Sequence, residues 1–400
     1  MKIAFIVEFP TQFEVPFYQY IDRWIKEQRV KGFVSLPTGQ AGAQPDKSIR
    51  EHFDFHVIYN YTDQQDYHDF ELGKKVGWGF NLYEGYRYFI ADKNDILSSI
   101  DKIIKVEKYD FVILNGYKNT YKGLPALIKE KNISIGLRID SVIYNLPFYK
   151  KILKRLYLPY AYRHFNHFFA VGSETKKFLG WLGINNQRMS YFSYATNDDW
   201  FKIQSQNKNK IKEIKDQWNI QTNQIIISVA KFVERESPWD TLKAFVSLNN
   251  PEITLILIGD GPDRDALVEF AQQYQHLKII FTGYILFTEL PFYYGLSKLF
   301  IHAAKNEPWG VSVQEALSCN CVVIASNKVG SAKDLLLTNK NGYTYTYGNV
   351  AELKHLIPLA LALAKEDLTA VNDAVLSQWN YNNMWLQIQE GTKKYINRKS

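Results

Sequence analysis

The chain has 400 residues, of which 46% are hydrophobic and 22% charged, an ordinary balance for a soluble globular protein. One hydrophobic core rarely serves so long a chain, so we expect two domains of about 200 residues each. Basic residues exceed acidic ones by seven. This surplus is compatible with an anionic ligand or membrane surface and is too small to indicate a nucleic-acid partner, so we expect none.

The cysteines and the apolar runs indicate the compartment. Cys319 and Cys321 flank the start of an expected strand, an arrangement that does not favour a disulfide between them. The apolar N-terminal stretch is too short for a signal peptide, and no run of about eighteen apolar residues occurs. We therefore expect a cytoplasmic protein.

The first half of the chain alternates strands with helices. Residues 2–9 form an apolar strand, and a helix is expected from about residue 16 to 28. The runs 109–116 and 133–141 are further strands that end in polar residues. Strand ends of a parallel sheet face one crevice, so Arg138 and Asp140 are site candidates by position. Capping the following segment is an equally good role for Asp140.

Residues 142–169 combine five cations with aromatic residues and contain no acidic residue. Basic side chains beside aromatic ones are typical of a segment that binds an anionic membrane surface. A solvated helix within the first domain is an equally good interpretation. The cations are Lys150, Lys151, Lys154, Arg155 and Arg163.

The second half begins with an apolar strand at residues 225–232, with Lys231 at its end and Arg235 in the following loop. The strand at 254–258 leads into Gly259-Asp260-Gly261, which lacks the third glycine of a dinucleotide fingerprint. The sequence Asp-Arg-Asp at 263–265 imitates a metal-binding motif. It lies at an expected helix start, where acidic residues complement the helix dipole, so we expect no metal there.

The stretch from residue 299 to 335 is strand, sharp loop, helix and strand. Its loop lies at the carboxyl end of a parallel strand, where the N–H groups of the next helix favour an anion. Glu307 and Glu315 bracket that helix start with seven residues between them. Carboxylates accept hydrogen bonds from hydroxyl groups, so the pair suits ribose and a sugar attached to phosphate. The alternative is a loop glutamate and a solvated helix glutamate without a shared role.

The sequence EPWGVSVQEA, followed by CVVIAS and VGSAKDLL, resembles the retaining glycosyltransferases of family 4, within the glycosyl transferases of group 1. The resemblance implies an α/β fold of the GT-B type, with two Rossmann-like doubly wound domains facing across a cleft. Residues 1–200 would bind the acceptor, and residues 201–380 the nucleotide sugar. Residues 381–400 would form a helix that crosses back onto the first domain.

The resemblance also implies roles for individual residues. Glu307 would contact the transferred sugar as a catalytic residue, with Asp140 beside the reacting sugar, and Lys231 would hold the diphosphate. Relatives place a second cation one or two residues after Arg235, which is the nearest cation here. The other implied donor contacts are Gly283, Tyr284, Trp309, Gly310, Val311, Ser312 and Glu315, and the acceptor or cleft contacts are Gln12, Phe13 and Arg138.

Family membership would mean transfer of a sugar, with retention, from a UDP- or GDP-linked donor without metal or other cofactor. The acceptor would be a glycan, lipid-linked, in bacterial-type polysaccharide or lipopolysaccharide assembly at the cytoplasmic face of a membrane. One rival is a nucleotide-sugar epimerase of the same fold, which would convert the donor without an acceptor. Another is a non-catalytic partner subunit, which the presence of both glutamates argues against.

Overall fold

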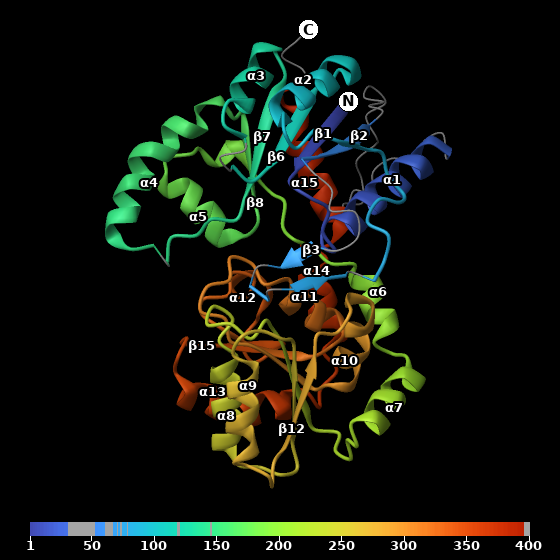
Figure 1. Cartoon of the computed structure of the whole chain (residues 1–400), viewed down its shortest axis with the longest axis vertical. Helices are drawn as coiled ribbons and strands as arrows, with labels where there is room; N and C mark the ends of the chain where they lie inside the picture. The colour runs from blue at the N-terminus through green and yellow to red at the C-terminus, as the bar shows by residue number, and fades with distance from the viewer. Residues whose placement is uncertain are drawn as a thin grey trace, which may run out of the picture.

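The computed structural model describes residues 1–30, 53–60, 67–69, 71–72, 74–77, 79–117, 121–144 and 146–395. Within these ranges the chain forms two parallel β-sheets, one above the other, each covered by helices (Figure 1). A two-stranded antiparallel hairpin, β3 (Tyr67–Asp69) and β4 (Lys74–Val76), lies between them. The predicted α/β fold of two doubly wound domains is confirmed.

The first sheet has seven strands in the order β5-β2-β1-β6-β7-β8-β9. A parallel sheet is buried on both faces, which explains why its strands are nearly continuous apolar runs. The strands are β1 (Lys2–Val7), β2 (Asp54–Tyr59), β5 (Tyr88–Ile90), β6 (Phe111–Asn115), β7 (Ser134–Ile139), β8 (His167–Ala170) and β9 (Met189–Tyr191).

Two apolar cores cover the faces of this sheet. One contains α2 (Ile96–Glu107), α3 (Leu124–Glu130) and α5 (Ser173–Trp181). The other contains α1 (Val15–Val30) and the C-terminal helix α15 (Tyr381–Lys393). On α15, the fully buried ring of Trp385 makes edge contacts with Phe53 and Trp24 at centroid distances of 5.5 and 6.1 Å. The end of the described chain is therefore part of the first domain's core.

The second sheet has six strands in the order β12-β11-β10-β13-β14-β15. They are β10 (Ile225–Val229), β11 (Thr254–Ile258), β12 (Lys278–Gly283), β13 (Leu299–His302), β14 (Val322–Ser326) and β15 (Gly342–Tyr345). The helices of one covering layer are α8 (Pro238–Leu248), α9 (Arg264–Gln272) and α13 (Val350–Leu363). Those of the other layer are α6 (Asp198–Gln204), α7 (Lys208–Gln217), α10 (Leu290–Leu296), α11 (Val311–Ser318), α12 (Ala332–Leu335) and α14 (Thr369–Leu376).

Each sheet has one point at which the strand order reverses direction. In the first sheet it lies between β1 and β6, and in the second between β10 and β13. Helices leave the sheet to opposite faces on either side of such a point, so a crevice opens at the carboxyl ends of the two strands. We therefore expect a ligand-binding site in the loops that follow β10 and β13.

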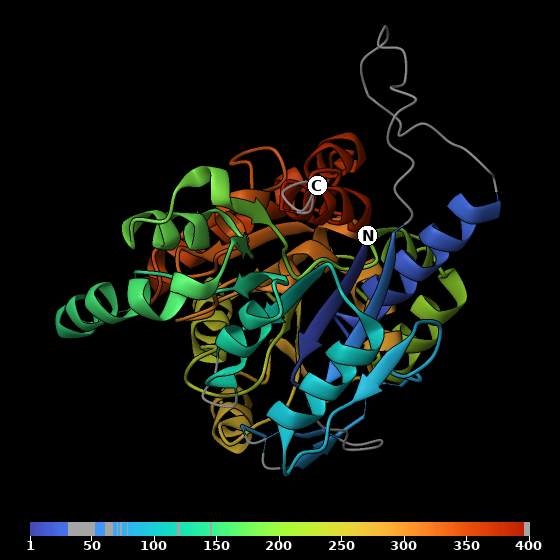
Figure 2. The same cartoon turned by 90° about the horizontal axis from the view of Figure 1, so that it is seen from above.

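Helix α4 (Phe148–Ala161) projects from the side of the first domain (Figure 2). Seven large apolar or aromatic side chains on it are 47–79% exposed. The rest of the predicted membrane segment 142–169 behaves differently, because Phe165 and the strand β8 are buried in the core. The predicted contact with a membrane surface is therefore wrong for residues 165–169. Residue 145 of the segment lies outside the described residues. In the described part of the chain, no helix is long and apolar enough to span a membrane.

Candidate functional site

Two loops at the switch point of the second sheet carry the predicted charged residues. The loop after β10 holds Lys231 and Arg235, and the loop after β13 holds Glu307. The N–H of Lys305 donates to the carbonyl oxygen of Arg235 at 2.8 Å, so the backbone ties the two loops together. A pair of cations and a carboxylate therefore meet at one edge of the sheet.

Backbone hydrogen bonds fix the loop that carries Glu307. Its N–H donates to the carbonyl of Lys328 at 3.1 Å, and its own carbonyl accepts from the N–H of Gly330 at 2.9 Å. Its side-chain Oε1 accepts from the N–H of Trp309 at 3.3 Å, and Oε2 lies 3.3 Å from Nη1 of Arg235. Burial raises the pKa of the carboxyl. Glu307 is thus held in a defined orientation beside a cation.

The start of α11 is open toward the same loop. Gly310 precedes the helix with a φ of 89° and provides no side-chain cap. A Cβ at this position would lie 3.2 Å from Glu307 Cγ and 3.2 Å from His302 Nε2, so glycine meets both the conformational and the steric requirement. The N–H groups of Val311 and Ser312 belong to the first helical turn and have no acceptor within the helix. This geometry suits an anion such as phosphate.

Glu315 lies on α11 and is buried, which excludes the interpretation as a solvated helix glutamate. The hydroxyl of Tyr294 donates to its Oε2 at 2.9 Å. Burial raises the pKa of Glu315 to about 7, although the hydrogen bond from Tyr294 acts in the opposite direction. Further hydrogen-bond donors, such as those of a ligand, would favour the charged form of this carboxyl.

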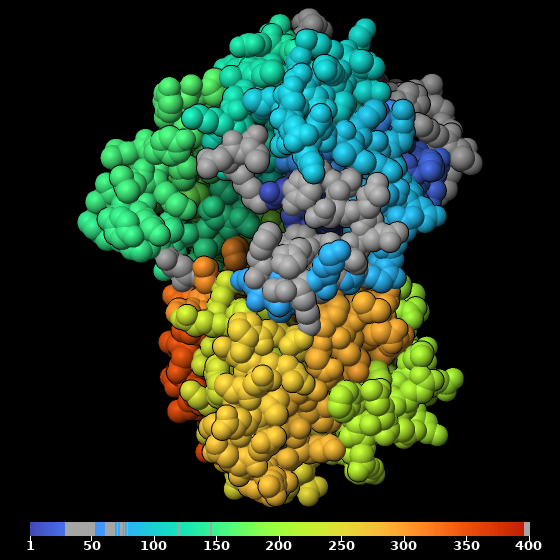
Figure 3. Space-filling view, in the orientation of Figure 1, coloured from blue at the N-terminus to red at the C-terminus, as the bar shows by residue number. Residues whose placement is uncertain are grey.

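Carboxylates of the first domain contact both cations. Lys231 Nζ lies 2.7 Å from Asp69 Oδ2 and 2.7 Å from Glu71 Oε2. Arg235 Nη2 lies 3.1 Å from Glu71 Oε2, and this guanidinium is the main cause that lowers the pKa of Glu71 to about 2. In Figure 3 the hairpin that carries Asp69 lies against the second domain. Two negative groups therefore occupy the cations that were predicted to hold a diphosphate.

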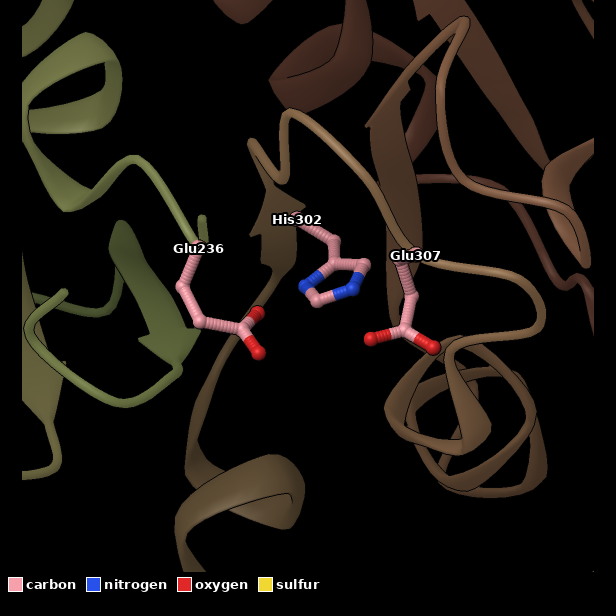
Figure 4. Close-up of side chains that lie close together, drawn as sticks. All are labelled: Glu236, His302 and Glu307. Carbon is pink, nitrogen blue, oxygen red and sulfur yellow. The ribbon is translucent and has the colours of Figure 1, made fainter. Parts of the chain in front are cut away.

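Glu236, His302 and Glu307 converge at the carboxyl ends of β10 and β13 (Figure 4). Among the described residues they are the one group of three potential metal ligands, with ligand atoms within 4.8 Å of one another. Arg235 Nη1 lies 2.7 Å from Glu236 Oε1 and 3.3 Å from Glu307 Oε2, so a cation already bridges the two carboxylates. A metal ion would have to share this space with the guanidinium, which Coulomb repulsion opposes. The cluster therefore fits hydrogen bonding better than metal coordination.

Trp309, predicted to contact the donor, has its side chain in the interface between the domains. Its Nε1–H donates to the carbonyl of Tyr194 at 3.1 Å, and its ring centroid lies 4.9 Å from that of Trp379. A Cβ on Gly172 would lie 2.6 Å from the indole. So large an apolar surface is buried where the domains meet, and a donor contact by Trp309 stays a prediction. The backbone N–H of Trp309, bonded to Glu307, remains at the site.

Arg138, predicted to face the cleft, is 2% exposed. Its Nη1 donates to Glu14 Oε1 at 2.6 Å, and its Nε and Nη2 donate to the carbonyls of Phe192 and Ser193 at 2.9 and 2.7 Å. A buried guanidinium needs such partners, and these are supplied entirely by the protein. Arg138 therefore holds the segment after β9 against the first loop and does not line the cleft.

The other first-domain candidates lie at the carboxyl edge of the first sheet. Asp140 follows β7, is half-buried and accepts a hydrogen bond from the Tyr194 hydroxyl at 3.3 Å. Gln12 and Phe13 are half-buried in the loop after β1. Their proposed contacts with an acceptor stay predictions.

Gly283 and Tyr284 end β12, two strands from the charged loops. Gly283 has a φ of 75°, and its carbonyl accepts from the N–H of Gly259 at 3.0 Å. The Tyr284 hydroxyl donates to the carbonyl of Gly77 in the first domain at 3.0 Å. A nucleotide base contact here stays a prediction.

Two Rossmann-like domains, with a helix start that lacks a side-chain cap at the second switch point, define the class as the GT-B fold. The structure of a glycosyltransferase from Rickettsia africae superposes with a TM-score of 0.73 at 16% identity, covering 99% of this chain and 98% of that one. Anabaena HepE in complex with UDP-glucose superposes with a TM-score of 0.67 at 15% identity and covers 98% of both chains.

Residues 210–374 match the family model described as glycosyl transferases group 1. The alpha-monoglucosyldiacylglycerol synthase of Acholeplasma laidlawii is 28% identical over 162 residues, which are 39% of this chain. The chain spans 40% of the length of that curated relative. The family match therefore lies in the half of the chain that carries Lys231, Arg235, Glu307 and Glu315.

Proposed function

We propose that the protein is a retaining hexosyltransferase of glycosyltransferase family 4 that uses a UDP- or GDP-linked sugar. The observation that carries this proposal is the position of Glu307 between the cation Arg235 and the open start of α11. The match of residues 210–374 to glycosyl transferases group 1 supports it. So does the UDP-glucose bound by the structural neighbour HepE.

In the proposed reaction, the bond between the anomeric carbon and the diphosphate oxygen breaks while an acceptor hydroxyl oxygen bonds to that carbon. The acceptor proton passes to the departing diphosphate, which takes the electron pair. Lys231, Arg235 and the N–H groups at the start of α11 stabilise the negative charge that develops there. Glu307 accepts hydrogen bonds from the transferred sugar, and Glu315 from the ribose. These cations supply positive charge without a metal ion.

The first test measures release of UDP or GDP from a panel of nucleotide sugars with and without glycan and glycolipid acceptors. We expect release that requires an acceptor and a product that keeps the anomeric configuration, determined by NMR. Glu307→Gln should lower turnover on the order of a hundredfold, as loss of a preorganised polar contact does. Conversion of the donor to another nucleotide sugar without acceptor would instead identify an epimerase.

The acceptor is proposed to be lipid-linked and to be reached by docking of α4 on the cytoplasmic face of a membrane. The similarity to a diacylglycerol glucosyltransferase supports a lipid acceptor. The exposed apolar residues of α4 would enter the lipid headgroup region, and its cations would contact anionic lipids. These apolar residues are Phe148, Tyr149, Ile152, Leu153, Leu156, Tyr157 and Tyr160.

Vesicle co-sedimentation tests this docking. We expect the protein to pellet with phosphatidylglycerol vesicles, less with phosphatidylcholine, and less as salt rises, because exposed charges are screened over about 8 Å at physiological ionic strength. Changing Lys150, Lys151, Lys154 and Arg155 to Ser should abolish most of the binding.

The matched control changes four lysines of α7 to Ser, which removes the same charge from the second domain. Equal loss in both variants would show that net charge, and not α4, determines binding. The control lysines are Lys208, Lys210, Lys212 and Lys215.

A further inference from the structure

His302 is a buried histidine whose hydrogen-bonding groups are unused. It is 3% exposed, and neither ring nitrogen has a hydrogen-bond partner among the described residues. Burial lowers the pKa of the imidazole, so at neutral pH the ring offers one N–H donor and one nitrogen acceptor. Unpaired buried polar groups are rare because they cost stability. Both ring nitrogens of His302 are therefore free to form hydrogen bonds with a ligand.

The surroundings of His302 show where that partner would sit. Its ring lies between the carboxylates of Glu236 and Glu307 (Figure 4). Because the three ligand atoms lie within 4.8 Å of one another, an oxygen at their common centre would be up to about 2.8 Å from each, a hydrogen-bond length. Gly310 adds no side chain to this space, where a Cβ would lie 3.2 Å from His302 Nε2. Arg235 Nη1 borders the same space, so a ligand hydroxyl there would also accept a hydrogen bond from the guanidinium.

The charge of the cluster limits which chemical group fits. Glu236 and Glu307 contribute two negative charges, and Arg235, in contact with both, contributes one positive charge. Carboxylates only accept hydrogen bonds, so the ligand must supply donors, and hydroxyl groups do so while also pairing with an imidazole. A further carboxylate would be repelled in so buried a place. The cluster thus suits neutral, hydroxyl-bearing ligands.

We propose that Glu236 and His302, together with Glu307, form a hydroxyl-binding subsite for the sugar ring of the donor, and that Glu236 excludes sugars that carry a carboxylate. This inference rests on the proposed function, because it places the transferred sugar at Glu307. It adds a substrate class: the donor carries a neutral hexose and not a hexuronic acid. Sequence reasoning had assigned neither Glu236 nor His302 to the site.

Isothermal titration calorimetry of the wild-type protein is the first test. The ligands are UDP, UDP-glucose and UDP-glucuronate, and in parallel GDP, GDP-mannose and GDP-mannuronate. We expect the neutral nucleotide sugar of the series that binds to have at least about tenfold higher affinity than its uronate. Equal affinities would overturn the subsite. Failure of every nucleotide and nucleotide sugar to bind would instead overturn the proposed function.

Three variants distinguish a direct role in the subsite from an indirect effect. Glu236→Gln should bring the affinities for the neutral nucleotide sugar and its uronate to within about threefold, because uronate binding improves by more than the affinity for the free nucleotide changes. If Glu236→Gln weakens binding of the free nucleotide and of the nucleotide sugar equally, the residue acts only by holding Arg235, and the proposal is wrong.

His302→Leu should weaken binding of the nucleotide sugar but not of the nucleotide, and should raise the melting temperature of the ligand-free protein. His302→Gln should restore part of the sugar binding, and no difference between the two His302 variants would contradict a hydrogen-bonding role.

Discussion

At the scale of single residues, Glu315 links the stability of the protein to pH. Its carboxyl group is buried on α11 with Tyr294 as hydrogen-bond donor, and burial raises its pKa to about 7. Asp198 is a second such group, because burial raises its pKa to about 7 as well. Both groups bind a proton more tightly in the folded protein than in the unfolded chain. Their contribution to stability is therefore present at low pH and lost as pH rises through about 7.

This loss of stability with rising pH gives a testable prediction for Glu315. The melting temperature of the ligand-free protein should fall between pH 5 and pH 8, and the Glu315→Gln variant should show a smaller fall. Each pKa unit corresponds to about 1.4 kcal/mol, so the raised pKa of one such group contributes on the order of 3 kcal/mol to the pH dependence. Asp198→Asn is the matched comparison and should reduce the same slope. Identical slopes in wild type and Glu315→Gln would show that this carboxyl is not buried as described.

A buried carboxylate that lowers stability at neutral pH suits a residue that serves a binding site. Replacing Glu315 by Gln should make the ligand-free protein more stable above pH 7 and the ribose contact weaker. A gain in stability at the expense of ligand binding is typical of residues that serve a site. The same reasoning applies to His302, because its two unpaired ring nitrogens also lower the stability of the ligand-free protein.

At the scale of elements, the hairpin β3–β4 competes with the predicted diphosphate. Its residue Asp69 and the following Glu71 contact Lys231, and Glu71 also contacts Arg235. A diphosphate needs the same two cations, so both sets of negative groups cannot use them together. Under the proposed function, binding of the diphosphate would break these ion pairs.

Removal of the competing charges tests this point. Asp69→Asn combined with Glu71→Gln should tighten binding of the free nucleotide several-fold and steepen its dependence on salt concentration, as measured by calorimetry. The control is Glu213→Gln, which removes a carboxylate from the exposed Lys210 pair on α7. Weaker nucleotide binding in the double variant would show that the hairpin carboxylates assist the ligand and do not compete with it.

Elements with strong local signals were predicted closely. The apolar run that begins at Cys321 predicts a strand over residues 321–325, and the structure has Val322–Ser326. The helix expected from 16 to 28 is Val15–Val30. The start of α11 could be placed because Gly310 breaks the apolar pattern, and its φ of 89° accounts for the glycine. Periodicity and glycine position are local properties, so the sequence alone reveals them.

At the scale of the whole molecule, contacts between distant segments could not be predicted. The pairing of Glu71 with Lys231 spans 160 residues, and no local pattern marks it. Trp309 belongs to the motif EPWGVSVQEA, from which a donor contact was predicted. Its side chain nevertheless packs between the domains against Trp379. Arg138 ended a strand as predicted, but its partners Glu14 and Phe192 come from other loops. Tertiary packing decides the direction of such side chains.

The central claim is that the switch point of the second domain binds a nucleotide diphosphate through Lys231 and Arg235. Calorimetric titration of UDP and of GDP into wild type, Lys231→Ala and Arg235→Ala tests it most directly, with Lys210→Ala on the surface of α7 as control. We predict that one nucleotide binds wild type and the control equally well, and binds each of the two site variants at least about tenfold more weakly, because each loses a charge-assisted contact. Undiminished nucleotide binding by both site variants, or no binding by wild type, would contradict the claim.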